Sequence, residues 1–136
     1  MKIKLDTDAI MPVRAHELDA GYDLFSRDSR IVPAGGDAVF DTGVHIQLDE
    51  GTAALIVAKS GLNTHQGITS AGLIDAGFTG SIKVKLYNHG KKDYNVNKGD
   101  KISQFTIIPI KTPTLELVEN LDEFPRGENG YGSTGR

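Results

Sequence analysis

Residues 71–88 read AGLIDAGFTGSIKVKLYN, and the second half of this stretch is the clearest strand pattern of the chain. Apolar residues alternate there with lysines, in the order Ile82, Lys83, Val84, Lys85 and Leu86. A period of two is typical of a strand that buries only one face. Just before it, Gly77 and Gly80 bracket Phe78. The stretch therefore predicts a tight glycine-flanked hairpin that leads into a half-buried strand.

Other short strands surround this one. Val44, Ile46 and Leu48 repeat the alternation, whereas residues 55–57 (LIV) and 105–108 (FTII) are denser and rich in β-branched side chains. Dense strands are expected where both faces are covered, so these two should form the core. Sixteen glycines and five prolines mark frequent turns and leave room for little more than one turn of helix. This pattern predicts an all-β sandwich or barrel of the jelly-roll kind.

Length and composition limit what the chain can do. Its 136 residues suit one domain, expected over residues 1–120, followed by a mobile arm over residues 121–136. It has no cysteine, and its four histidines lack metal-ligand spacing, which argues against a zinc site. The net charge of −3 argues against nucleic-acid binding, and no apolar run is long enough for a membrane span. We expect a soluble cytoplasmic protein, or one of the host-cell cytoplasm if it is viral.

Asp75 is the first candidate for chemistry, because it follows two apolar residues where the glycine-flanked turn begins. A carboxylate on a rigid turn can act as a general base for water, and the neighbouring Phe78 can support a sugar or a base. The alternative is structural, with Asp75 in an Asx-type turn and Phe78 in the core.

Three other polar segments could bind a ligand. Asp23, beside a glycine in AGYDLFS, is either a turn cap or a ligand for a metal-bound water. Lys59, Ser60 and Gly61 directly follow a dense strand, which suits either a phosphate grip or a plain strand-to-turn transition. Gln104 interrupts an apolar strand, so its amide, if buried, must be hydrogen-bonded to backbone or to something such as an ordered water.

The last eleven residues, RGENGYGSTGR, cannot build a packed core. Their four glycines add no apolar area and lose much backbone entropy on ordering. Arg126 and the hydroxyls of Ser133 and Thr134 could bind phosphates, and Tyr131 could stack on a base. The segment is therefore either a lid for a nucleotide or a disordered end.

Taken in order, these segments resemble the trimeric dUTP pyrophosphatases (dUTPases) along nearly the whole chain. Five motifs carry the resemblance: AGYDLFS, AKSGL, AGLIDAGFTG, KGDKISQF and RGENGYGSTG. It implies a jelly-roll-like β-barrel of the dUTPase type with a flexible glycine-rich C-terminal arm. It also implies a homotrimer with shared active sites, in which the arm of one subunit closes a neighbouring subunit's site.

The resemblance further implies a role for each matched residue. Asp75 would activate the water that attacks the α-phosphorus, Gln104 would hold that water, and Phe78 would lie beneath the deoxyribose. Mg²⁺ would bind mainly to triphosphate oxygens and waters, and Asp23 would reach it through water. The residues implied in substrate binding are Lys59, Ser60, Gly61, Thr69, Gly72, Leu73, Ile74, Phe78, Lys83, Arg126, Tyr131, Gly132, Ser133 and Thr134.

Four of these residues depart from the usual pattern of the family. Lys59 stands where arginine is usual, so a point charge replaces a bidentate fork. Phe78 replaces tyrosine but keeps a ring face, so we expect discrimination against UTP to be retained. Tyr131 replaces phenylalanine or histidine, and Thr69 stands where many bacterial members carry an asparagine that contacts uracil.

The expected function is hydrolysis of dUTP to dUMP and pyrophosphate, which would limit uracil incorporation into DNA and supply dUMP for dTMP synthesis. Two alternatives stay open. A dCTP deaminase would share the fold and the trimer, but it normally has a glutamate base where Asp75 stands here. A dUTPase-like regulatory protein would bind a protein partner, as yet unknown, without needing turnover.

Overall fold

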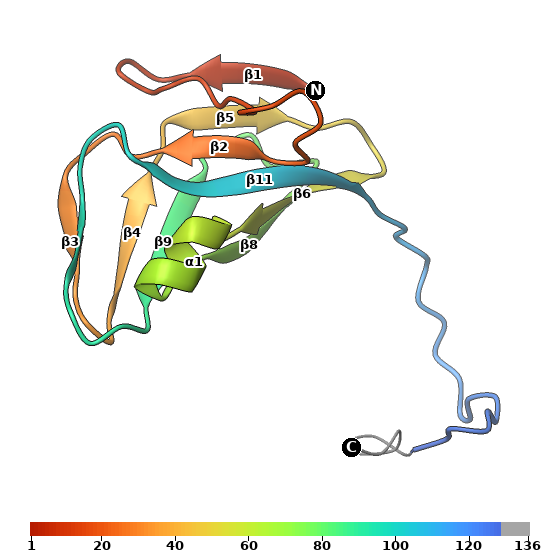
Figure 1. The fold of residues 1–136 in the computed structure, drawn as a ribbon. Helices are drawn as coiled ribbons and strands as arrows, with labels where there is room; N and C mark the ends of the chain where they lie inside the picture. The colour runs from red at the N-terminus through yellow and green to blue at the C-terminus, as the bar shows by residue number, and fades with distance from the viewer. Residues whose placement is uncertain (129–136) are drawn as a thin grey trace.

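Antiparallel strands are the main regular structure of the protein (Figure 1). The computed structural model describes residues 1–128, and the account below is confined to them. The elements are β1 (Lys2–Leu5), β2 (Tyr22–Phe25), β3 (Arg30–Val32), β4 (Asp37–Asp41), β5 (Val44–Gln47), β6 (Thr52–Val57), α1 (Ser60–Gln66), β7 (Ile68–Thr69), β8 (Ala71–Asp75), β9 (Lys83–Asn88), β10 (Tyr94–Val96) and β11 (Lys101–Pro109).

The strands form several small sheets around one core. The largest has the order β2-β11-β6-β8, the second has the order β4-β9-β7, and β1-β5 and β10-β3 form pairs. One hydrophobic cluster joins the two larger sheets, and it includes Ile56 and Phe105 from one and Phe40 and Val84 from the other. The expectation of an all-β, jelly-roll-like fold is confirmed.

The two alternating strands are confirmed. Val44 and Ile46 of β5 are buried, with the half-buried His45 between them. Val84 and Leu86 of β9 are fully buried, and the lysines between the apolar positions face away from the core.

The two dense strands differ in part from expectation. Ile56 and Phe105 are buried in the core, but Leu55, Val57 and Ile107 are only half-buried. β6 lies between β11 and β8, so its backbone is paired on both sides. The outer face of this sheet, however, is only partly covered by the residues described. The high content of β-branched residues therefore indicated a strand at the centre of a sheet, and not a strand buried on both faces.

The segment after β6 is more helical than predicted. The sequence left room for about one turn, whereas α1 has seven residues, or about two turns. Lys59 is extended and its carbonyl accepts the first helical hydrogen bond, from Asn63 N at 2.9 Å. Gly67 ends the helix with a left-handed φ of 66°, the conformation that glycine adopts most readily. Ser60 and Gly61, predicted as a turn, therefore begin a helix.

The predicted hairpin is also wrong. β8 pairs with β6, whereas β9 pairs with β4 and β7, so residues 76–82 cross from one sheet to the other. We call residues 76–82 the crossing turn. The glycines do mark a tight turn, in which Phe78 N donates to Asp75 O at 3.0 Å. The local sequence showed the turn but not the pairing, which depends on distant strands.

β11 ends at Pro109, and residues 111–128 are exposed and contain no strand (Figure 1). The domain boundary near residue 120 stays a prediction. Tyr131, Gly132, Ser133 and Thr134 lie outside the described residues. No helix within residues 1–128 is long and apolar enough to cross a bilayer.

Candidate active site

The crossing turn frames a hollow of about 430 Å³, which we call the Asp75 hollow. Its lining residues are Leu73, Ile74, Asp75, Phe78, Ser81, Ile82 and Lys83. The structure thus brings together five of the residues predicted to form the site. Sequence reasoning missed Ser81 and Ile82, which became candidates only when the turn folded them toward Asp75.

The Asp75 carboxylate has no partner among the described residues. It is exposed at the end of β8, and within residues 1–128 its side chain makes no hydrogen bond or ion pair. An Asx-type turn would tie that side chain to nearby backbone, so the structural alternative for Asp75 is wrong. The carboxylate is available to contact a water or a hydroxyl group.

Phe78 is not a core residue. Its exposed fraction is 46%, and the ring forms one wall of the Asp75 hollow. An exposed aromatic face beside an available carboxylate is suited to a sugar or a base. The alternative that placed Phe78 in the core is therefore wrong.

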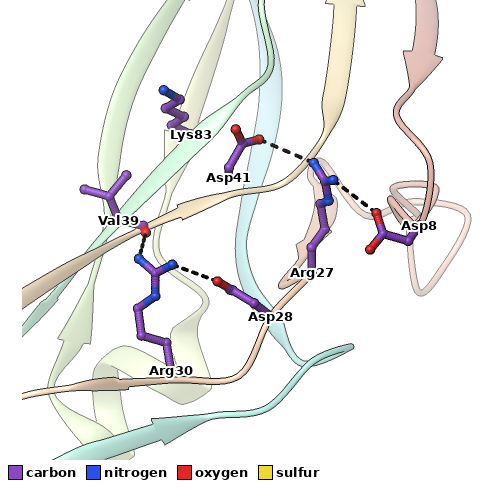
Figure 2. Close-up of a pocket in the computed structure, with 7 residues that line it drawn as sticks. All are labelled: Asp8, Arg27, Asp28, Arg30, Val39, Asp41 and Lys83. Atoms are coloured by element: carbon purple, nitrogen blue, oxygen red, sulfur yellow. Dashed lines mark hydrogen bonds and ion pairs between the residues drawn. The ribbon is translucent and has the colours of Figure 1, made fainter.

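Lys83 connects this hollow with a larger, charged one of about 510 Å³. In the charged hollow, Arg27 lies 3.0 Å from Asp8, and Arg30 lies 2.7 Å from Asp28 (Figure 2). Lys83, by contrast, makes no ion pair with any residue that the structure describes. Its charge is therefore available to an anion at the edge of the Asp75 hollow.

A second group of predicted residues meets where β2, β11 and the start of α1 come together. Asp23 is buried in β2, with an exposed fraction of 5%. Its carboxylate pairs with Lys59 on one oxygen and with Lys101 at 2.8 Å on the other. We call Asp23, Lys59, Lys101 and Gln104 the Asp23 cluster. Asp23 is an ion-pair acceptor and not a turn cap, so the cap hypothesis is wrong.

The two lysines decide the ionisation of Asp23. Burial by itself would raise the pKa of this carboxyl, but the hydrogen bonds and positive charges of Lys101 and Lys59 outweigh burial and hold the pKa below its ordinary value. Asp23 is therefore a carboxylate at neutral pH, and the cluster keeps a net positive charge.

Gln104 lies beside this cluster, partly buried in β11. Its amide nitrogen donates to Ala58 O at 3.4 Å, so the backbone partner expected for it is present. A Cβ placed on Gly21 would come within 2.6 Å of Gln104 Oε1. The glycine of AGYDLFS therefore makes room for Gln104, a link between two motifs more than 80 residues apart in sequence.

Asp75 and Gln104 do not meet within one chain. In the strand register, Gln104 is level with Val57 of β6, whereas Asp75 is level with Ala53. Four residues of strand separate these levels by about 13 Å, and β8 and β11, on opposite sides of β6, lie about 10 Å apart. One water cannot contact both side chains of the same chain.

Three further predicted residues neither line the Asp75 hollow nor belong to the Asp23 cluster. The Thr69 hydroxyl is 2.8 Å from His89 Nε2, and Gly72 pairs with Ile56 inside the sheet. Arg126 lies on the exposed segment after β11.

The donor set for a metal ion is small. Among residues 1–128 no three His, Asp or Glu side chains are close enough to hold a cation. Both carboxylate oxygens of Asp23 already face lysines. Such a set fits Mg²⁺ only if most of its ligands are waters and substrate oxygens, which is a common arrangement for this ion.

Comparison with known proteins gives a consistent result. The family model described as dUTPase matches residues 7–135. A deoxyuridine 5'-triphosphate nucleotidohydrolase of Clostridium tetani is 46% identical over 140 residues, covering 100% of this chain and 97% of the relative. The enzyme of that name from Oryza sativa subsp. japonica is 44% identical, covering 97% of this chain and 78% of the relative.

Solved structures agree with these sequence matches. A dUTPase of Staphylococcus bacteriophage 80alpha with dUPNHPP has a TM-score of 0.92 at 31% identity, covering 99% of this chain and 98% of that chain. A variant dUTPase from phage phi11 of S. aureus, described for its structural Mg(II) ion, has a TM-score of 0.81 at 29% identity, covering 88% of this chain and 96% of that chain. The chain therefore belongs to the dUTPase family.

Proposed function

We propose that this protein hydrolyses dUTP to dUMP and pyrophosphate by attack of water on the α-phosphorus. The observation that carries the proposal is the Asp75 hollow, in which an available carboxylate and an exposed aromatic ring face one space in a chain of the dUTPase family. The relatives named above carry a hydrolase name, so the dCTP deaminase and regulatory-protein hypotheses are not favoured. The reaction would act on the cytoplasmic nucleotide pool.

In this proposal the Asp75 hollow binds the nucleoside. Asp75 activates the attacking water and contacts the deoxyribose 3′-hydroxyl. Phe78 lies beneath the sugar and fills the space that a 2′-hydroxyl would need. Leu73 and Ile74, with the backbone at Gly72, read uracil, and Thr69 stands where other members use an asparagine.

The triphosphate binds to cationic and hydroxyl groups. Lys59, Ser60 and Gly61 contact the bridging and terminal phosphates, and Lys83 and Arg126 add positive charge. Lys59 is already paired with Asp23, so it serves as a shared cation for that carboxylate and for the phosphates. Phosphoryl transfer depends mainly on positioning and on charge neutralisation, which suits these groups.

Two chains must contribute to each site. Because Asp75 and Gln104 lie far apart in one chain, a water between them requires Gln104 from a neighbouring subunit. A homotrimer with three shared sites meets this requirement by symmetry. The half-buried outer face of β6 and β11 offers apolar area for such contacts.

Mg²⁺ would accompany the substrate and neutralise charge on its phosphates. Asp23 would hold the ion through water, because its own oxygens face Lys59 and Lys101. The arm, including Tyr131, Gly132, Ser133 and Thr134, would close over uracil and the phosphates of a neighbouring site and release product on opening.

The direct test is pyrophosphate release from dUTP, dCTP, dTTP and UTP with Mg²⁺, with the nucleotide product identified in each case. Release from dUTP alone, giving dUMP, is the expected result. Conversion of dCTP to a deaminated product, or silence on all four nucleotides, would contradict the proposal.

A further inference from the structure

The crossing turn is held from outside by His45. Thr79 lies between Phe78 and Gly80, and its carbonyl oxygen accepts a hydrogen bond from His45 Nδ1 at 2.9 Å. His45 belongs to β5, 34 residues earlier in the chain, and lies opposite Lys4 of β1. It comes from none of the five motifs that indicated the family.

The ring of His45 is fixed at both ends. Its Nε2 lies 3.1 Å from Asp6 Oδ1, and its side chain is only 19% exposed. The Thr79 carbonyl oxygen can only accept a hydrogen bond, so the ring nitrogen that faces it, Nδ1, donates. Asp6 lies against the other end of the ring, at Nε2, and the ring holds the backbone of the turn.

The residue on the other side of Gly80 is held as well. The Ser81 hydroxyl donates to Asp41 Oδ1 and accepts from Gly43 N at 3.0 Å. The hydrogen bonds from Ser81 and from Gly43 N hold the pKa of Asp41 below its ordinary value, against the opposing effect of burial. Both neighbours of Gly80 are thus tied to side chains outside the turn.

A single arginine lies beside both Asp6, the partner of His45, and Asp41, the partner of Ser81. Arg27 lies between Asp8 and Asp41, as Figure 2 shows, at 3.0 Å and 3.8 Å. The same guanidinium lies 3.4 Å from Asp6. The charged residues beside β4 therefore support the crossing turn. The arginines among them are already paired with carboxylates.

We propose that His45 is a positioning residue for sugar selection: it fixes the Thr79 carbonyl and so keeps the Phe78 ring at the wall of the Asp75 hollow. The inference rests on the proposed function, because it assumes that Phe78 excludes a ribose 2′-hydroxyl. A displacement of about 1 Å in a site can cost about 100-fold in rate, so a loosened turn would be felt by the substrate. Ser81 and Asp41 hold the other flank but do not contact the residue next to Phe78.

Two substitutions separate the two bonds of His45. In His45→Asn the amide nitrogen occupies about the place of Nδ1 and keeps the bond to Thr79. In His45→Gln the amide nitrogen reaches about as far as Nε2, so it keeps Asp6 and loses Thr79. The control is His16→Gln, in an exposed loop, where the ring makes no hydrogen bond within residues 1–128.

The measurement is the ratio of kcat/KM for dUTP to kcat/KM for UTP, with hydrogen exchange of peptides covering residues 76–82. We expect His45→Gln to lower the ratio about tenfold and to speed the exchange, because the turn loosens. His45→Asn and His16→Gln should stay close to the unmodified protein in both measurements. An unchanged ratio in His45→Gln, or an equal loss for both nucleotides in both His45 variants, would overturn the inference.

Phe78→Ala, measured in parallel, distinguishes the inference from the proposed function. If Phe78→Ala lowers the ratio and His45→Gln does not, only the role of His45 fails. If Phe78→Ala leaves the ratio unchanged while dUTP is still hydrolysed, the proposed role of Phe78 fails and sugar selection through His45 fails with it.

Discussion

The ring of Phe78 lies directly against Gly80: a Cβ placed on Gly80 would come within 2.5 Å of Phe78 Cζ and 2.8 Å of Cε2. Contacts this short do not occur between real side chains, so any larger residue at position 80 must displace the ring. The ring is the end of a rotatable side chain. A larger residue at position 80 should therefore move the ring without unfolding the protein.

Gly80→Ala should weaken sugar selection. We expect the ratio of kcat/KM for dUTP over UTP to fall about tenfold as the ring moves from the wall of the hollow. Gly77→Ala is the matched control, because a Cβ at Gly77 would meet nothing within 4 Å. A crystal structure of the variant with the ring in place, together with an unchanged ratio, would rule this explanation out.

Asp75→Asn should separate binding from catalysis. The amide keeps the shape of the side chain but cannot act as a base, so kcat should fall by about 10²- to 10⁴-fold. Affinity for a non-hydrolysable dUTP analogue should change little, as calorimetry would show. Glu50→Gln removes an exposed acid from the turn before β6 and serves as the control. Near-normal turnover of Asp75→Asn would remove Asp75 from the base role.

Mixing two inactive variants tests whether sites are shared. Asp75→Asn and Gln104→Leu chains should each be nearly inactive alone. In an equimolar mixture that is unfolded and refolded together, about a quarter of the sites would pair an intact Asp75 with an intact Gln104 from the neighbouring chain. Recovery of about a quarter of the normal activity is expected. No recovery, despite mixed trimers detected by mass spectrometry, would mean that the two residues do not serve one site.

Asp23→Asn should reduce stability at neutral pH by about 1–3 kcal/mol, because it leaves two lysines without their buried counter-ion. Breaking a buried pair costs about 3–5 kcal/mol, and solvent screening of the partly exposed lysines lowers this figure. Urea unfolding at fixed protein concentration would measure it. The exposed Lys85–Asp37 pair provides the control, and Asp37→Asn should cost about 0.5 kcal/mol or less.

The effect of Asp23→Asn should depend on pH. The folded-state pKa of Asp23 lies below its unfolded value, so its contribution is complete above the ordinary value of 3.8 and is lost as pH falls through the lower folded-state pKa. The difference between the two proteins should therefore shrink in acid. A difference that grew on acidification would show that the lysines do not stabilise this carboxylate.

Deletion of residues 126–136 should leave an assembled protein with little activity, because Arg126 and the stacking and phosphate-binding groups of the arm would be lost. Light scattering would report the assembly and pyrophosphate release the activity. A glycine and serine linker of equal length in place of residues 126–136 controls for chain length. Pyrophosphate release by the truncated enzyme at the rate of the full chain would contradict the lid hypothesis.

The sequence by itself determined the alternating strands and supplied the residues proposed for the chemistry of the site. A period of two around Ile46 and Val84 reports which side chains face the core, because that information lies in neighbouring residues. It also supplied Asp75 and Phe78 as a pair on one turn, since they are three positions apart in the chain. The prediction of a turn at Ser60 and Gly61 was wrong, because residues common in turns can also begin a helix.

The tertiary structure decided which of these groups meet. Strand register separates Asp75 from Gln104, and pairing across distant strands makes residues 76–82 a crossing between sheets. The lysines that neutralise Asp23 and the histidine that holds Thr79 come from segments 34 to 78 residues away. Contacts between residues so far apart depend on how the sheets pack around their shared core, and no local pattern of residues encodes them.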